Sequence, residues 1–316
     1  MSDMIRRLNA AWQTRNHGAR SDHAAHPDLG INAPLLTIPQ LVGKANRTVV
    51  EGAIRARCQA LPLDEETVLC RILGRYKFLV DRRDLGLSVH LMLDGYWEFW
   101  ATDFILRHLK PGQVAFDVGA NLGYYAVLMA DCVGPKGHVH VVEPNPHLAV
   151  LIEKNLCLNG FTEVTTRHRA AAFSTSGVQL RFAAEAHDPK NGHLLAPDAA
   201  AAPAEYAVRS ICLDDLADRP AHFIKVDVEG AEEAVWHGMQ RLLDVSPEVI
   251  VLMEFNAARC AGPAALLAAI GARFPLRELN FHARVIDSNA PDLLRRSEDS
   301  LLLLTNRTRL EPQRVL

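Results

Sequence analysis

One segment constrains the fold of this chain more than any other: residues 114–125, which read Val-Ala-Phe-Asp-Val-Gly-Ala-Asn-Leu-Gly-Tyr-Tyr. An apolar run ends in Asp117, a turn containing Gly119 and Gly123 follows, and a helix-forming stretch begins at about Leu122. This order is typical of a buried parallel strand that leads through a tight loop into a helix. The spacing matches neither the G-x-G-x-x-G of a dinucleotide site nor the lysine-containing P-loop. The segment therefore predicts one strand–loop–helix unit of an α/β sheet.

The same loop indicates a kind of ligand. A glycine turn with an acid at the end of its strand suits a nucleoside that carries a positive charge, and S-adenosylmethionine (SAM) carries a sulfonium and an α-ammonium group. Glu143 ends the next predicted strand, where a carboxylate can accept hydrogen bonds from both hydroxyls of a ribose. Pro144 stiffens the turn behind it. Simple packing of the strand against the helix would also explain the two glycines, so the loop alone leaves both interpretations open.

Strands and helices alternate along most of the remaining chain. This alternation predicts an α/β protein with a parallel, doubly wound sheet. The strands are expected at Val114–Val118, His138–Val142, near Val164–Ala171, at Phe223–Val226 and at Glu248–Met253, with Leu276–Phe281 and Leu301–Leu304 as a closing antiparallel pair.

The segments around this sheet are predicted from their composition and periodicity. Two apolar runs flank Gly74 within residues 68–80 and predict a hairpin, and residues 97–109 have the apolar stripe of an amphipathic helix. The N-terminal residues are polar and weakly periodic. The expected divisions are 1–48, a poorly ordered segment or surface arm; 49–110, a hairpin and helix region that packs on the core; 111–306, the main domain; and 307–316, a tail.

The alternation is interrupted between Phe173 and Leu213, where the pattern becomes extended and rich in loop residues. We expect Val178–Phe182 and Tyr206–Ile211 to form extra strands on either side of a mobile loop that includes Ala196–Ala204. Loops of this length inside a compact domain are usually functional or disordered. The sequence leaves both a lid and a disordered loop open.

Four predicted strands end in acids: Asp117, Glu143, Asp227 and Glu254. Ligands of open α/β sheets bind beyond the carboxyl ends of the strands, so these acids are candidate ligand-binding groups. Acids at the start of helices are also favoured by the helix dipole, which is the simpler alternative. Glu229 follows Asp227 closely, and the glycine after it lets the backbone approach a ligand.

Composition excludes several classes of protein. The chain has 34 basic and 37 acidic residues, which gives no reason to expect binding to a nucleic-acid backbone. It has no apolar run long enough for a transmembrane helix, and its first residues lack the apolar core of a signal peptide. Its six cysteines form no C-x-x-C pair. We therefore expect a cytoplasmic protein with reduced, buried thiols, no membrane span and no nucleic-acid partner.

Several ordered blocks together resemble the FkbM family of SAM-dependent methyltransferases. The resemblance extends from about residue 68 to about residue 306, and the chain departs from the family pattern at Ala231, where the family often has histidine. The blocks are residues 95–98 (Gly-Tyr-Trp-Glu), 117–125, 142–146 (Val-Glu-Pro-Asn-Pro), Asn155 with Asn159-Gly160, 213–216 (Leu-Asp-Asp-Leu), 224–232 (Ile-Lys-Val-Asp-Val-Glu-Gly-Ala-Glu) and 247–254.

The resemblance implies a class I SAM-methyltransferase (Rossmann-like) fold: a seven-stranded sheet, mostly parallel, with an antiparallel closing strand. It also implies SAM as the cofactor and O-methylation of a hydroxyl on a sugar, glycan or natural-product acceptor. Methyl transfer of this kind is an in-line displacement, so the protein must hold an oxygen about 3 Å from the methyl carbon and take up the proton of the hydroxyl.

Site residues follow from combining the motifs with the resemblance. Near the reacting centre we expect Asp227 first, and then Glu229 and Glu98 as carboxylates that position the substrate. A divalent metal is compatible with so many acids, but no ligand spacing requires one. SAM binding is assigned to Asp117, Gly119, Asn121, Gly123, Glu143, Asn145 and Ala171.

Two other functions remain as alternatives. An NAD-dependent oxidoreductase conflicts with the glycine spacing and with the absence of a Tyr-x-x-x-Lys pair. A SAM-binding interaction module without turnover would fit better if the acidic block at 227–233 were degraded, and it is intact. A nucleic-acid methyltransferase is disfavoured because the chain has no Asn-Pro-Pro-Tyr block and no basic excess. The expected partner is a small-molecule or glycan acceptor.

Overall fold

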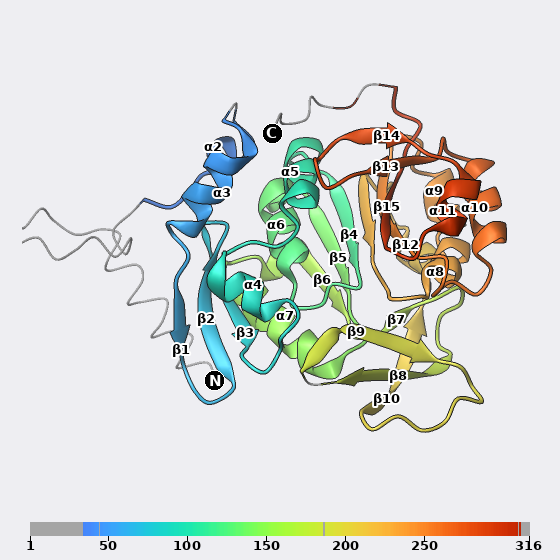
Figure 1. The fold of residues 1–316 in the computed structure, drawn as a ribbon, viewed down its shortest axis with the longest axis horizontal. Helices are drawn as coiled ribbons and strands as arrows, with labels where there is room; N and C mark the ends of the chain where they lie inside the picture. The colour runs from blue at the N-terminus through green and yellow to red at the C-terminus, as the bar shows by residue number, and fades with distance from the viewer. Residues whose placement is uncertain (1–33, 44, 186, 309, 311–316) are drawn as a thin grey trace, which may run out of the picture.

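The computed structural model describes residues 34–43, 45–185, 187–308 and 310, and its centre is a mixed sheet (Figure 1). The eight strands of this sheet have the order β14-β13-β15-β12-β11-β4-β5-β6 in the described residues. The strands β4 to β6, β11 and β12 pair in parallel, as the alternation predicts. These parallel strands are β4 (Val114–Val118), β5 (His138–Val142), β6 (Thr165–His168), β11 (Phe223–Val226) and β12 (Ile250–Phe255).

The other strands close the sheet in antiparallel fashion. They are β13 (Arg277–Leu279), β14 (Val285–Asp287) and β15 (Ser300–Leu304), and β15 lies between β12 and β13. This confirms the late antiparallel pair, but the sheet has an eighth strand where seven were expected. The extra strand arises because the chain turns back after β13, with Ala283 in the left-handed region at φ 56° and Asn280 N–H donating to the Arg284 carbonyl at 3.0 Å.

Helices cover both faces of the sheet, and each face has its own apolar core. On β4, Ala115 belongs to one core and Phe116 to the other, because successive residues of a strand point to opposite faces. The first core includes α5 (Phe99–His108), α6 (Tyr124–Val133) and α7 (Pro146–Leu158), and the second includes α8 (Glu232–His237), α9 (Gln240–Asp244), α10 (Pro263–Gly271) and α11 (Ala290–Arg295).

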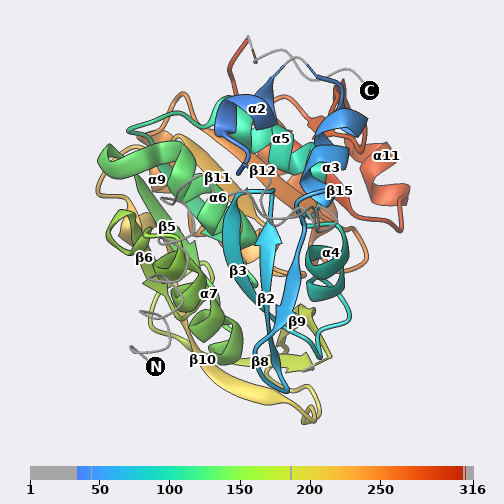
Figure 2. The same cartoon turned by 90° about the vertical axis from the view of Figure 1, so that its left-hand side faces the viewer.

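The N-terminal region packs against the first of these cores (Figure 2). The predicted hairpin is present as β2 and β3, and two asparagines fix it in place, one within α7 and one at the C-cap of that helix. Asn155 accepts from Leu79 N–H at 2.6 Å and donates to the Leu79 carbonyl at 3.0 Å, and Asn159 pairs in the same way with Lys77. The region consists of α2 (Ile38–Val42), α3 (Arg47–Arg55), β1 (Ala60–Pro62), β2 (Thr67–Ile72), β3 (Tyr76–Asp81) and α4 (Ser88–Leu93).

This packed region begins earlier in the chain than residue 49. Leu36 and Leu41 are buried in the core, and the Leu36 carbonyl accepts a hydrogen bond from Arg75 at 3.1 Å. The segment from 34 to 48 is therefore not a surface arm in its described part. The expectation for residues 1–33 lies outside the described residues, as does that for most of the tail at 307–316.

The interruption between residues 173 and 213 is a second, smaller sheet. Its strand order is β7-β10-β8-β9, with β7 (Ala171–Ala172), β8 (Gln179–Glu185), β9 (Asp188–Leu195) and β10 (Glu205–Ile211). The two extra strands are confirmed as β8 and β10, but the prediction of one long loop between them is wrong, because β9 occupies eight of its residues. Pro189, Asn191 and Gly192 have the residue types of a turn, and the pairing of β9 with β8 is irregular there, because it runs through Asp188 on one side and through residues 193–195 on the other.

The helices and the cysteines bear on two further expectations, the absence of a membrane span and the burial of the thiols. In the part of the chain that the structure describes, the helices are too short or too polar to cross a bilayer. All six cysteines are free; four are buried, Cys58 is half-buried, and Cys157 is exposed, so the expectation of buried thiols is wrong for Cys157.

Candidate functional site

The chain order reverses at the middle of the large sheet, where β4 and β11 are neighbours. Open α/β sheets bind ligands beyond the carboxyl ends of their strands at this switch point. Gly119 follows β4, and Asp227 follows β11. Gly119 has φ +78°, and a Cβ atom placed on it would lie 1.7 Å from the Asp227 carbonyl oxygen. The residue must be glycine because the two strand ends touch.

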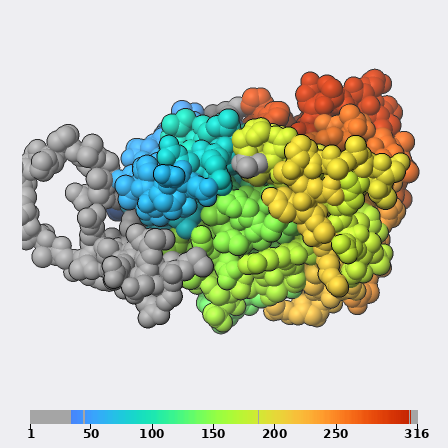
Figure 3. All heavy atoms as spheres, turned by 90° about the horizontal axis from the view of Figure 1, so that it is seen from below, coloured from blue at the N-terminus to red at the C-terminus, as the bar shows by residue number. Residues whose placement is uncertain are grey.

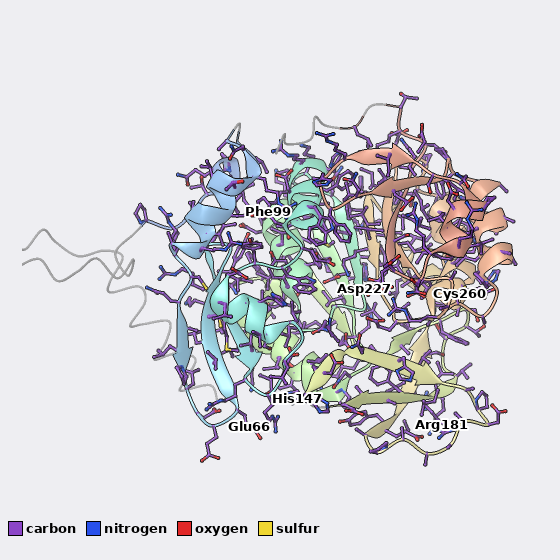
Figure 4. All side chains as sticks on the ribbon, in the orientation of Figure 1. Glu66, Phe99, His147, Arg181, Asp227 and Cys260 are labelled. Carbon is purple, nitrogen blue, oxygen red and sulfur yellow. The ribbon has the colours of Figure 1, made fainter. Side chains whose placement is uncertain are left out.

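A cavity opens beyond these two strand ends, and four parts of the chain line it. Figure 4 places Asp227 near the middle of the molecule, above the inserted strands. The lining residues include Gly119, Asn121, Glu143, Ala171, Lys225, Asp227 and Glu229 from the switch-point region; Leu87, Trp97 and Glu98 from the N-terminal region; Phe182, Leu194 and residues 189–192 from β8 and β9; and Glu254, Arg259 and Asp299 from the closing end of the sheet.

Glu143 ties two loops of the cavity together. One carboxylate oxygen accepts from Asn121 N–H at 2.7 Å and the other from Asn145 N–H at 2.8 Å. The side chain is buried, and burial raises the pKa of Glu143 to about 8, although the two N–H donors oppose this shift. Each carboxylate oxygen can accept a second hydrogen bond, so a ribose contact at Glu143 remains compatible with this geometry and stays a prediction.

Three of the predicted cofactor residues support the cavity without lining it. Asp117 is fully buried behind Gly119, neither of its carboxylate oxygens has a hydrogen bond, and burial raises its pKa to about 6. Gly123 begins α6 with φ 83°, and Asn145 caps α7 by accepting from His147 N–H at 3.0 Å. Direct contact of these three residues with a cofactor stays a prediction.

Asp227 is paired with a lysine of β11, the strand that it directly follows. Lys225 Nζ donates to Asp227 Oδ2 at 2.8 Å and lies 4.9 Å from the centre of the Tyr125 ring. Burial alone would lower the pKa of Lys225, but the charges of Asp227 and Asp117 raise it above its ordinary value. The lysine is therefore a buried cation, and the Asp227 side chain keeps 31% of its surface exposed toward the cavity.

Glu98 comes from the N-terminal region and lines the same cavity as Asp227, while its role in positioning a substrate stays a prediction. It caps the start of α5 with φ 36°, and its Oε2 accepts from the Tyr125 hydroxyl at 3.0 Å. Burial raises the pKa of Glu98, and the charge of Asp227 raises it further. Glu98 and Asp227 thus form opposite parts of one wall around the buried Lys225.

Glu229 lies on the other side of Asp227 and shares a cation with two more acids. Arg259 contacts Glu229 and Asp299 and pairs with Glu254 at 2.6 Å. Burial raises the pKa of Glu229 to about 7, and the charge of Asp227 adds to the shift. Asp227, Glu229 and Glu254 offer oxygens within 4.8 Å of one another that suit a metal ion, and Arg259 supplies positive charge to this group.

Backbone strain is concentrated at this cavity. Five described residues other than glycine have positive φ, and three of them line the cavity: Glu98, Asn121 and Glu229. Such conformations cost of order 1–3 kcal/mol each and persist where the surrounding structure fixes them, often at functional sites. Two of the three are the acids predicted beside Asp227.

Sequence reasoning missed four residues of the cavity. Lys225 lies on β11 two positions before Asp227, which directly follows that strand, so the period of a strand could have linked them. Trp97 lies inside the matched block 95–98 but was not assigned a role. No local signal points to Lys190 or Arg259, because the folding of distant segments brings them to the site.

Comparison with known proteins finds a family model, described as the methyltransferase FkbM domain, that matches residues 117–281, more than half of the chain. Shorter matches occur to protein-L-isoaspartate O-methyltransferases. The protein of Ignicoccus hospitalis is 40% identical over 57 residues, which is 18% of this chain and 27% of that protein. The protein of Caenorhabditis elegans is 45% identical over 56 residues, 18% of this chain and 25% of that protein. The chain thus matches about a quarter of the length of these curated relatives.

Similar solved structures include methyltransferase FkbM from Methylobacillus flagellatus KT. Its TM-score is 0.39 at 14% identity, with 68% of this chain and 52% of that chain covered. Another is a TehB-like SAM-dependent methyltransferase from Corynebacterium glutamicum, with a TM-score of 0.40 at 11% identity, covering 70% of this chain and 94% of that chain.

Proposed function

The chain belongs to the methyltransferase FkbM domain family, and from this premise we propose that it transfers a methyl group from SAM to a hydroxyl of a sugar, glycan or natural-product acceptor. The observation that carries the proposal is the contact of Gly119 with Asp227 at the switch point. This contact joins the predicted cofactor loop to the predicted reacting acid in one cavity.

The residues of the cavity fit SAM. Gly119 leaves the backbone of its loop open to a nucleoside. Glu143 lies at the end of the neighbouring strand, where it can accept a hydrogen bond from a ribose hydroxyl. Asp117 lies behind this loop and interacts with the charge of Lys225, so it supports the loop and the lysine from below. The wall is rich in carboxylates, as a cofactor with a sulfonium and an ammonium group requires.

When bound, SAM would supply a methyl group that is already activated for transfer. The protein would hold the acceptor oxygen in line with the carbon–sulfur bond, so that a carbon–oxygen bond forms as the carbon–sulfur bond breaks and its electron pair goes to sulfur. Asp227, kept in place by Lys225, would accept a hydrogen bond from the hydroxyl. The proton would pass to Asp227 or to Glu229, whose pKa of about 7 suits a general base at neutral pH.

The alternatives make different forecasts. An oxidoreductase would bind NAD, which neither the family nor the glycine spacing favours. A binding module would bind SAM without turnover, and its carboxylates would not need shifted pKa values. The strained backbone at Glu98 and Glu229 favours an enzyme, because such strain is expected where chemistry requires a fixed geometry.

The proposal can be tested with the whole chain and methyl-labelled SAM. Wild type and Asp227→Asn are incubated with fractionated cell extract, and labelled products are identified by mass spectrometry. We expect a labelled hydroxyl compound with wild type and little or none with the variant, and calorimetry should show SAM binding to both. Binding of NAD without SAM would contradict the proposal, and SAM binding without any labelled product would favour the binding module.

A further inference from the structure

Three cations line the cavity, and two of them are neutralised by acids. Lys225 pairs with Asp227, and Arg259 pairs with Glu254 and contacts two further carboxylates. The third cation is Lys190, which lies on β9. Its ammonium group forms no ion pair or hydrogen bond with any residue that the structure describes. Its ammonium group therefore has unused hydrogen-bonding capacity inside a cavity that binds a ligand under the proposed function.

The side chain of Lys190 is held in place by the N-terminal region. Its stem packs on Gly86, where an added Cβ atom would lie 2.8 Å from Lys190 Cδ and 3.0 Å from Cγ. Its Nζ lies 5.8 Å from the centre of the Trp97 ring, within the range of a cation–π contact. Because the stem is already seated, less rotamer freedom is lost when the ammonium group binds a ligand.

The hairpin that carries Lys190 is itself anchored to the N-terminal region. Leu85 N–H donates to the His187 carbonyl at 3.0 Å, just before β9 begins. Figure 3 shows the described N-terminal region (blue to cyan) and the inserted strands (yellow) side by side on this face of the molecule. Lys190 and Trp97 thus belong to one wall, built where these two parts of the chain meet.

Glu98 is the carboxylate on which the charge of Lys190 acts, but it interacts mainly with other residues. Its carboxylate accepts from the Tyr125 hydroxyl and lies among Lys225 and Asp227, whose charges act on it more strongly than that of Lys190. Lys190 acts on Glu98 only through its charge, and the two form no ion pair. The ammonium group is therefore available to a negatively charged group of a bound molecule.

We propose that Lys190, seated on Gly86 and Trp97, forms a subsite that binds one anionic group, a carboxylate or a phosphate, of a molecule held in the cavity. This inference rests on the proposed function and adds to it a requirement on the ligand. Two molecules can supply the group: the cofactor, through the carboxylate of its methionine part, or an acidic acceptor.

The first experiment uses calorimetry and needs no acceptor. Wild type, Lys190→Met and Lys190→Arg are titrated with S-adenosylhomocysteine, which carries the carboxylate, and with 5′-methylthioadenosine, which lacks it. If the cofactor supplies the anion, Lys190→Met should bind S-adenosylhomocysteine about tenfold to hundredfold more weakly. Its affinity for methylthioadenosine should stay unchanged, and Lys190→Arg should restore most of the loss. Lys136→Met, on an exposed turn outside the cavity, is the matched control.

The second experiment identifies an acidic acceptor. Extract is separated by anion exchange, and each fraction is labelled with methyl-labelled SAM and either wild type or Lys190→Met. An acceptor anion predicts unchanged cofactor affinity and at least a tenfold loss of labelling in the acidic fractions, partly restored in Lys190→Arg.

A folded Lys190→Met variant with unchanged cofactor affinity and unchanged labelling would overturn the subsite. If wild type labels no fraction at all, the proposed function fails, and the calorimetric experiment then decides the subsite alone.

Discussion

Substitution of Gly119 by alanine tests the contact at the switch point directly. The added Cβ atom would lie 1.7 Å from the Asp227 carbonyl oxygen and 2.8 Å from its carbonyl carbon. Both are backbone atoms, so a side-chain rotation cannot relieve the overlap, and the strand ends must move apart. The backbone at φ +78° adds a second penalty, which for a left-handed residue is about 1–2 kcal/mol.

Gly160 separates the two penalties. It has φ +77°, and an added Cβ atom would meet no heavy atom within 4 Å. Gly160→Ala should therefore lose only about 1–2 kcal/mol through backbone strain. Gly119→Ala should lose that amount and about 1–3 kcal/mol more from overpacking. At about 2–4 °C per kcal/mol, we expect a fall in Tm of about 2–8 °C for Gly160→Ala and about 4–20 °C for Gly119→Ala.

The assay combines thermal unfolding with calorimetric titration of SAM. We expect Gly160→Ala to bind SAM normally, and the folded fraction of Gly119→Ala to bind it weakly or not at all, because the displaced loop carries Asn121 into a different position. Equal Tm values and equal SAM affinities for the two variants would refute the argument, since the contact with Asp227 would then have no consequence.

Three further predictions concern the acids. Asp227→Asn keeps the size of the side chain and should leave SAM affinity nearly unchanged in calorimetry, while turnover of the acceptor falls by about 10²–10⁴; wild-type turnover would assign Asp227 a structural role. Glu143→Ala removes the acceptor of two buried N–H groups, so it should lose about 2–4 kcal/mol of stability in denaturant unfolding and bind SAM about tenfold to hundredfold more weakly. Burial raises the pKa of Glu229 from 4.5 to about 7, so its carboxylate becomes available as a base only as the pH rises through about 7. The plot of kcat/KM against pH should rise there and lose that limb in Glu229→Gln; an unchanged profile in the variant would exclude Glu229 as the base.

Local sequence patterns predicted the parallel strands well, because each strand is a short apolar run bounded by glycine, proline or an acid. They also predicted α5 and α6, but not the helices α2 to α4 or α9 to α11. Local patterns failed for β9, since Pro189, Asn191 and Gly192 have weak strand preference, and the strand is held to β8 by the residues on either side of them, Asp188 and residues 193–195. They also failed for β14, which forms because the chain turns back at Ala283 and then pairs with β13.

The same limit applies to the site. Gly119, Asn121, Glu143 and Asp227 lie in motifs at strand ends, so the topology of the sheet was enough to bring them together. Lys190 reaches the cavity on the inserted hairpin and Arg259 in the loop between β12 and α10, and no local pattern predicts where those segments dock. Glu98 was found only through its resemblance block, because nothing in its immediate neighbours indicates that it would lie beside Asp227.

The cavity wall at Lys190 and Trp97 joins segments about a hundred residues apart, and Glu98 meets Asp227 across an even longer stretch of chain. Closing loops of this length is slow, because chain entropy is lost before the contacts form. The large sheet can therefore form before the wall does, and an intermediate of folding would have the strand ends without the enclosing residues. In such a state Lys225 would keep Asp227 and Asp117 at the strand ends but would lack Glu98, which comes from the N-terminal region. Recovery of cofactor binding during refolding should then lag behind recovery of secondary structure.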